Sequence, residues 1–179
     1  MKKLFTILIT FMLISVAAAG IVSAGEYQEN PDDYSYLFEH GTTQKKDLEL
    51  TEVKRIAILY TSSPLPQSLF LDMDDEKSYY DPGTDIFYNV KVSKYINDMD
   101  EEELSKLKEI WEDSDFNNWE FRYEGTAEMD YECHFAIETE DEIYHYLIRG
   151  VDAPAPESLN KFISDILHTF WDSEIISTQ

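Results

Sequence analysis

The sequence predicts an α+β protein in which an antiparallel sheet of about five to seven strands carries two amphipathic helices packed on one face. Three observations support this fold class. Several short segments alternate apolar and polar residues, two segments have apolar residues at helical spacing, and helices do not alternate regularly with strands. A doubly wound parallel sheet needs that regular alternation and is disfavoured. We therefore expect a single α+β domain over residues 51–179, a length that buries a core without disulfides.

The strands expected before the first helix are runs of β-branched, aromatic and aliphatic residues. Pro64 and Pro66 end the first run because proline cannot continue a strand ladder. Pro82–Gly83 marks the turn before the fourth run. The predicted strands cover residues 53–62, residues 68–73, a short return strand at about 79–80, and residues 86–92.

Two segments are predicted as helices. The first covers residues 100–113, where Asp100 and Glu103 match the pattern of a capping box. The second covers residues 156–172, and Pro156 suits its first helical position. We expect this second helix to be the main cover of the core, because it has a wide apolar stripe. The stripe consists of Leu159, Phe162, Ile163, Ile166, Leu167, Phe170 and Trp171.

Three more strands are expected between the helices, at residues 119–123, 129–137 and 143–149. The middle strand has the clearest alternation, with Cys133 on its apolar face and His134 on its polar face. This pattern predicts one face against the core and one face in water. The register of the hairpin at 129–149 stays open, because the last strand has apolar residues on both faces and a one-residue slip would exchange them.

The N-terminal segment predicts export. Residues 1–24 combine two early lysines, an apolar run and the small-residue site Val22-Ser23-Ala24, which is typical of a cleaved secretory signal peptide. The alternative is an uncleaved membrane anchor formed by residues 4–22. Residues 25–50 are expected to be an acidic, partly ordered leader. Its apolar residues at 34–38 are expected to dock on the domain as a strand or a short helical turn.

The charge of the chain restricts its partners. The formal net charge is −23, and removal of residues 1–24 with their two lysines leaves −25. Nucleic acid and anionic lipid are poor partners for such a surface, because binding to them depends on Lys and Arg. A cationic protein, a basic polymer or a divalent metal would be attracted. The alternative interpretation is that the charge provides solubility or salt tolerance.

Known catalytic motifs are missing from the sequence. The six glycines are too far apart to form a phosphate-binding loop or a nucleophile elbow, and no H-E-x-x-H or C-x-x-C is present. Cys133 is the only cysteine, so no internal disulfide forms, and we expect a buried thiol. We predict no cofactor, and whether the protein is an enzyme stays open, with the sequence favouring a non-enzyme.

Two groups of residues are candidates for metal binding. The first is a set of carboxylates around two turns, Asp72, Asp74, Asp81 and Asp85, since Ca²⁺ prefers clustered carboxylates. An EF-hand is excluded at this place because Lys77 and Gly83 occupy its Gly and Glu positions. The second group is His134 and His145, which one register of the hairpin places opposite each other and near Glu132. Solvated turns and exposed histidines are the simpler alternatives.

Tyrosines are frequent on the predicted strands. An aromatic ring with a polar tip suits recognition of sugars or proteins, and it suits an ordinary half-buried sheet equally. On the first interpretation, the interaction surface consists of Tyr79, Tyr80, Tyr88, Tyr144 and Tyr146.

The order of elements from Ser68 to Leu167 resembles small secreted or lipoprotein domains of unknown function. The resemblance rests on a hairpin near the YYDPG sequence at 79–83, an acid-capped helix, a W-x-F-x-Y strand at 119–123, a second hairpin and a P-E-x-L helix start. Those domains have no assigned activity, so no functional residue is transferred.

We predict a secreted, acidic, non-enzymatic binding domain for a cationic protein or polymer. The alternative is an extracellular hydrolase-like enzyme with an unrecognised site.

Overall fold

The computed structural model describes residues 30–39, 41, 42, 44, 47–61, 66–126 and 131–171. The chain divides into two compact units, residues 1–31 and 32–179, and the fold below is that of the second. The predicted signal peptide, the alternative anchor and Met129 of a predicted strand lie outside the described residues. The β-strands are β1 (Val53–Tyr60), β2 (Gln67–Asp72), β3 (Lys77–Asp81), β4 (Tyr95–Asp98), β5 (Arg122–Glu124), β6 (Glu132–Thr139) and β7 (Ile143–Arg149). The helices are α2 (Glu101–Glu112), α3 (Glu157–Phe170) and the 3₁₀ turns η1 (Ser35–Phe38), η2 (Leu50–Glu52), η3 (Val90–Val92) and η4 (Phe116–Asn118).

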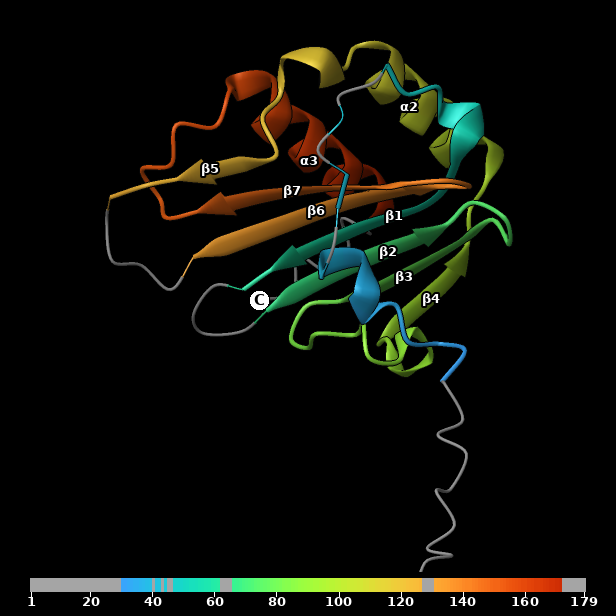
Figure 1. Ribbon diagram of the computed structural model, residues 1–179. Coiled ribbons are helices and arrows are strands. Elements are labelled where there is room, and N and C mark those ends of the chain that lie inside the picture. Colours follow the sequence, from blue (N-terminus) through green and yellow to red (C-terminus); the bar gives the residue numbers. More distant parts are fainter. Residues whose placement is uncertain are drawn as a thin grey trace, which may run out of the picture. The chain divides into compact units, whose positions relative to one another are not determined.

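The strands form a seven-stranded sheet in the order β4-β3-β2-β1-β6-β7-β5, shown in Figure 1. Every neighbouring pair is antiparallel except β5 and β7, which run parallel. Helix α2 and η4 lie between β4 and β5 and carry the chain from one edge of the sheet to the other. The predicted α+β class, with its strand number and its two helices, is confirmed.

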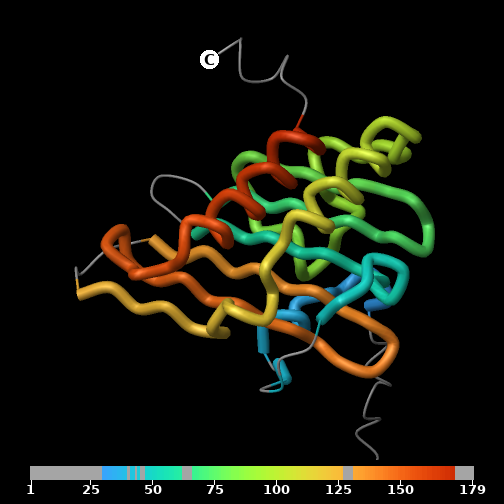
Figure 2. The backbone as a smooth tube through the Cα atoms, turned by 90° about the horizontal axis from the view of Figure 1, so that it is seen from above, coloured from blue at the N-terminus to red at the C-terminus, as the bar shows by residue number. Residues whose placement is uncertain are grey.

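Both α-helices lie side by side on one face of the sheet, as Figures 1 and 2 show. Helix α2 begins with the predicted capping box, in which Asp100 accepts from the Glu103 amide and Glu103 accepts from the Asp100 amide. In α3, Pro156 is the N-cap residue and not the first helical residue. The reason is that its ψ of 148° keeps it extended, and the chain turns helical one residue later.

The helix-side core contains a group of aromatic rings in mutual contact. Phe162 of α3 lies at its centre, with ring centroids 5.2–5.7 Å from those of four other aromatic residues. Its exposed fraction is 3 %. These four neighbours come from α2, η4, the segment before β5, and β6, and they are Trp111, Phe116, Trp119 and Phe135. Phe162 therefore joins both helices to the middle of the sheet.

The predicted strand at 86–92 is wrong. Ile86, Phe87 and Val90 are buried, while Tyr88 and Val92 are 67 % and 62 % exposed. This burial pattern does not alternate, because the chain turns at Asn89, whose side chain accepts from the Lys91 amide and starts η3. The fourth strand lies a few residues further on, as β4.

The second face of the sheet is not in water along β6, contrary to expectation. The apolar residues predicted to dock on the domain form η1, and Leu37 of η1 is 1 % exposed. Together with the segment between β3 and β4, η1 covers a second apolar cluster on this face. That cluster consists of Leu37, Ala57, Leu59, Phe70, Tyr79, Ile86, Phe87, Val90 and Ala136.

A partly buried charge network connects η1 to the sheet. Arg55 of β1 donates from Nη1 to Glu138 Oε2 of β6 at 2.7 Å, and its Nε lies 3.9 Å from Asp72 Oδ2 of β2. The hydroxyl of Tyr36 in η1 donates to the same Glu138 carboxylate at 3.0 Å. The guanidinium also lies 5.2 Å from the centre of the Tyr34 ring, which is a cation–π contact. One cation thus links three strands and the N-terminal turn.

Within the part of the chain that the structure describes, no helix is both long enough and apolar enough to cross a membrane.

Candidate functional site

The acidic turn residues are used as hydrogen-bond acceptors for their own turns. Asp72 Oδ1 accepts from the amides of Asp74 and Asp75 at 3.1 and 3.3 Å. Asp81 accepts from the Gly83 and Lys94 amides, and Asp85 accepts from the Phe87 amide. Each carboxylate therefore closes a loop, the ordinary role of Asp in turns.

The candidate calcium residues are not brought together. Asp72 pairs with Lys77 at the turn end of the β2–β3 hairpin, whereas Asp81 pairs with Ser68 at its open end. Four residues of strand separate these positions, which corresponds to about 13 Å. A single ion cannot reach both carboxylates. Asp74 is exposed and lies two residues after Asp72, at the turn end. Asp85 follows Asp81 by four residues, on the side of the open end.

The histidine pair, His134 and His145, is brought together. The two residues are not directly opposite, because His134 pairs with Leu147 and His145 with Ala136 in the register of β6 and β7. They meet along the diagonal, with the rings stacked at a centroid distance of 5.3 Å and an interplanar angle of 11°. His134 Nδ1 lies 3.1 Å from His145 Nε2, and His134 Nε2 lies 3.2 Å from Glu132 Oε2.

The neighbouring Glu132 carboxylate determines which imidazole nitrogens donate and which accept hydrogen bonds. Burial acts to raise the pKa of Glu132, but the hydrogen bonds from Arg149 and His134 outweigh it and hold that pKa below its usual value. The ionised Glu132 accepts from His134 Nε2, so Nδ1 of neutral His134 carries a lone pair and accepts from His145 Nε2. Burial first, then the interaction with His134 and then the charge of Arg122 lower the pKa of His145 to about 4.

Residues of the N-terminal segment pack against the histidine pair. The Phe38 ring of η1 lies 5.5 and 5.7 Å from the two imidazole centres. Gly41 lies against His145, and a Cβ at that position would be 3.0 Å from the Cβ of His145, so a larger residue would fit only if this contact opened by a few tenths of an ångström. Cys133 lies on the opposite face of β6 in the helix-side core, where burial raises its thiol pKa to about 12.

This arrangement limits the chemistry available. In the described residues, no group of three or more His, Cys, Asp and Glu side chains is placed to hold a metal ion. Among the described residues, the hydrogen bonds of the two imidazoles run to each other and to the Glu132 carboxylate, and not to a serine, threonine or cysteine. Since Cys133 faces away, the pair does not form a Cys–His dyad. What it provides is a partly buried imidazole, His145, whose pKa is lowered.

We expect acid to destabilise the fold through His145. In the unfolded chain this imidazole takes up a proton near pH 6.5, and in the folded chain near pH 4. Because the unfolded state binds more protons between these values, the free energy of unfolding falls as the pH falls through this window. The expected loss is about 2 kcal/mol after discounting for partial exposure.

Urea melts from pH 7 to pH 4 would measure this loss of stability. His145→Gln should flatten the slope, while the exposed His168→Gln should leave it unchanged, and equal slopes in all three proteins would refute the assignment.

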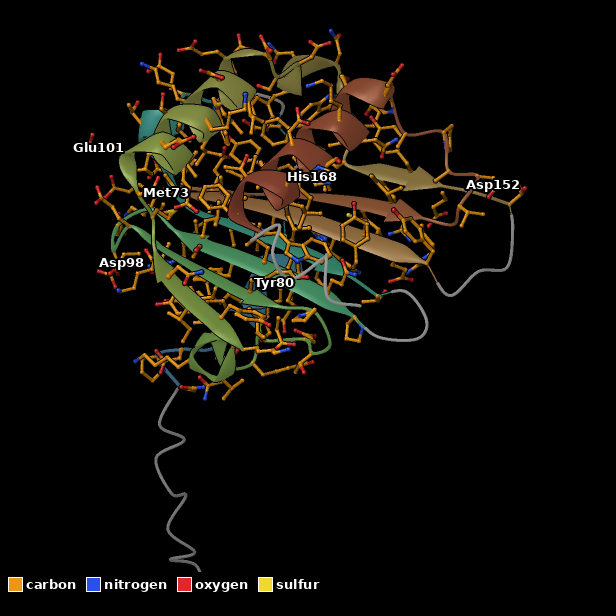
Figure 3. The ribbon with its side chains drawn as sticks, turned by 180° about the vertical axis from the view of Figure 1, so that it is seen from behind. Met73, Tyr80, Asp98, Glu101, Asp152 and His168 are labelled. Carbon is orange, nitrogen blue, oxygen red and sulfur yellow. The ribbon has the colours of Figure 1, made fainter. Side chains whose placement is uncertain are left out.

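The tyrosines predicted to form an interaction surface are mostly buried. Tyr79, Tyr80, Tyr144 and Tyr146 are 2–7 % exposed, and only Tyr88 of the five is exposed, at 67 %. Tyr79 lies in the cluster under η1, and the other three lie in the helix-side core. Figure 3 shows Tyr80 below the end of α3, where its ring lies 4.9 Å from that of Trp171. The four buried tyrosines serve as packing residues.

A groove of about 620 Å³ lies between residues 47–51 and the segment that runs from the end of α2 through η4. We call it the α2 groove. Its walls are tied together by the Trp111 indole, which donates to the Leu48 carbonyl at 2.7 Å, and by Asn117, which donates to the Asp47 carboxylate. Its apolar lining residues are Leu48, Leu50, Trp111 and Phe116, and its charged ones are Asp47, Glu49, Lys108, Glu112 and Asp115.

Sequence reasoning missed the α2 groove, although a signal was present. Helix α2 ends in Glu112 and is followed by Asp113 and Asp115, with no basic residue in its last turn. Carboxylates are unfavourable at this end, where the helix dipole is negative and Lys or Arg is preferred. This mismatch indicates that the C-terminal end of α2 would be stabilised by a positively charged group from a binding partner.

Comparison of the chain with protein-family models, with curated proteins and with solved structures gave no match.

Proposed function

We propose that the protein is a secreted, non-enzymatic binding domain that engages a cationic protein. The observation that carries this proposal is the net charge of −23, which rises in magnitude to −25 if residues 1–24 are removed. A surface potential of one sign speeds encounters with partners of the opposite sign. The acidic groups are widely distributed: in Figure 3, Asp98 and Glu101 lie at one side of the molecule and Asp152 at the other.

A folded core of this kind argues against the alternative of an acidic disordered chain. Two apolar clusters fill both faces of the central strands, so the charge is displayed on a rigid scaffold. A rigid scaffold lowers the entropy cost of forming a defined interface.

The enzyme alternative rests on one arrangement, the chain of hydrogen bonds from His145 through His134 to Glu132. A base oriented by a second group is a feature of many hydrolases. Here the rings pack against Phe38, and this favours a structural role over catalysis.

The test begins with protein collected from the culture medium, where we expect its N-terminus to be Gly25. The immobilised protein is then used to recover a partner from the same medium, and association rates are measured at low and high salt.

We expect a basic partner and saturable one-to-one binding. The on-rate should fall at least tenfold between about 20 and 500 mM salt, because the ions screen the attraction. An acidic partner, or an on-rate indifferent to salt, would contradict the proposal. Turnover of a small substrate would favour the enzyme.

A further inference from the structure

We infer that the α2 groove is the docking site for a Lys- or Arg-rich peptide segment that carries a bulky apolar side chain. This inference rests on the proposed function and adds the surface and the kind of sequence that it recognises. The groove volume of about 620 Å³ lies within the range of about 300–1,000 Å³ that is typical of ligand pockets. Its two walls belong to separate parts of the chain and are held by the Trp111–Leu48 hydrogen bond, so the groove is preformed.

The charge of the groove selects a cation. Four carboxylates line it against one lysine, and the Lys108 Nζ lies 3.9 Å from the nearest Glu112 oxygen, a distance typical of a loose surface pair. Two of the carboxylates, Asp47 and Asp115, are oriented by the side-chain amides of Asn117 and Asn118. Glu49 and Glu112 are exposed on opposite walls, where they can bind Lys or Arg of a partner.

The end of α2 adds to this preference. The carbonyls of its last turn and the carboxylate of Glu112 place negative charge together, without a basic residue in that turn. A guanidinium or ammonium group at this position relieves an unfavourable helix-dipole interaction in addition to forming an ion pair.

The floor of the groove explains the apolar part of the ligand. Leu48, Trp111 and Phe116 are each 5–6 % exposed and form its base, and Leu50 is only partly buried. An apolar side chain flanked by cations would cover Leu50 while its neighbours reach the carboxylates. The combination of a central apolar anchor with a charged rim is typical of specific protein interfaces.

Another acidic surface offers a matched control. The turn between β6 and β7 carries the exposed pair Glu140 and Asp141, and the hollow beside it has mainly polar lining residues. Lys54 Nζ lies 3.9 Å from Glu140, as Lys108 does from Glu112. Neutralising two carboxylates at either place changes the net charge of the protein equally. Long-range attraction is therefore the same in both variants, and only the local contacts differ.

The experiment measures the Kd of the full chain for a synthetic five-residue peptide, Phe flanked on each side by Arg and then Lys, by fluorescence anisotropy. We expect Glu49→Gln/Glu112→Gln to weaken binding about tenfold, and Glu140→Gln/Asp141→Asn to weaken it less than twofold. The same peptide with Ser in place of Phe should bind wild-type protein about fivefold more weakly.

The possible failures are distinguishable. Equal weakening in both double variants, or no preference for Phe over Ser, would refute docking in the groove while leaving salt-dependent attraction to cationic partners intact. If the wild-type chain shows no salt-dependent binding to a basic protein at all, the proposed function fails. Circular dichroism of each variant checks that it folds, and the four substituted side chains are exposed, so we expect unchanged spectra.

Discussion

Replacing Phe162 by alanine is expected to lower the free energy of unfolding by about 3–5 kcal/mol, the range observed for large aromatic residues in cores. The ring touches Trp111, Phe116, Trp119 and Phe135, so its removal leaves a cavity at the point where both helices meet the sheet. The surrounding rings are too rigid to fill such a cavity, and the cost should lie in the upper part of that range.

Urea-induced unfolding monitored by tryptophan fluorescence would measure this effect. Lys161→Ala is the matched control, because Lys161 precedes Phe162 on α3, is exposed, and pairs with Asp165 one turn further along the same helix. It should shift stability by less than about 0.5 kcal/mol. Similar shifts in both variants would show that α3 is not docked as described. Trp171→Ala should cost less than Phe162→Ala, since Trp171 is only half-buried at the end of the helix.

Replacing Arg55 by methionine is expected to lower stability by about 2–3 kcal/mol at pH 7, near the lower end of the cost of removing one partner of a buried ion pair. The guanidinium lies between Glu138 and Asp72, and its side chain is 21 % exposed. Without it, two carboxylates in poorly solvated positions lose their cation, and the contact with Tyr34 is lost. Methionine keeps most of the aliphatic packing, so the loss of stability measures the contribution of the guanidinium group.

The pH dependence of the Arg55→Met penalty provides a second check. Burial already raises the pKa of Asp72, against the backbone hydrogen bond from Asp75 and the charge of Arg55. Without Arg55 the pKa rises further, so the folded variant takes up a proton at a higher pH than its unfolded chain. The penalty should therefore be largest at neutral pH and shrink as the pH falls through the raised pKa of Asp72, which lies above its ordinary value of 3.8. Lys54→Met removes a more exposed cation of the same strand, whose side chain is 37 % exposed, and should cost less than about 0.5 kcal/mol at every pH. A penalty as large as that of Arg55→Met would exclude the network as the cause.

Features that depend on neighbours in the sequence were predictable. The capping box of α2 needs only residues three apart, and the stripe of α3 needs only the helical period. The strand at 86–92 was mispredicted because alternation in the sequence does not reveal that Asn89 bends the chain. In that segment a local side-chain hydrogen bond competes with strand pairing and prevails.

The sequence by itself determined the charge, the single cysteine, the two helices and the α+β class, because composition and periodicity are properties of the chain. Tertiary structure decided which tyrosines are buried, that His134 and His145 meet diagonally, and that Arg55 joins three strands to η1. It also placed residues 47–51 beside the end of α2, about 60 residues away in sequence, and so formed the groove. These contacts depend on strand register and long-range packing, in which a shift of one residue exchanges every side chain between the faces of the sheet.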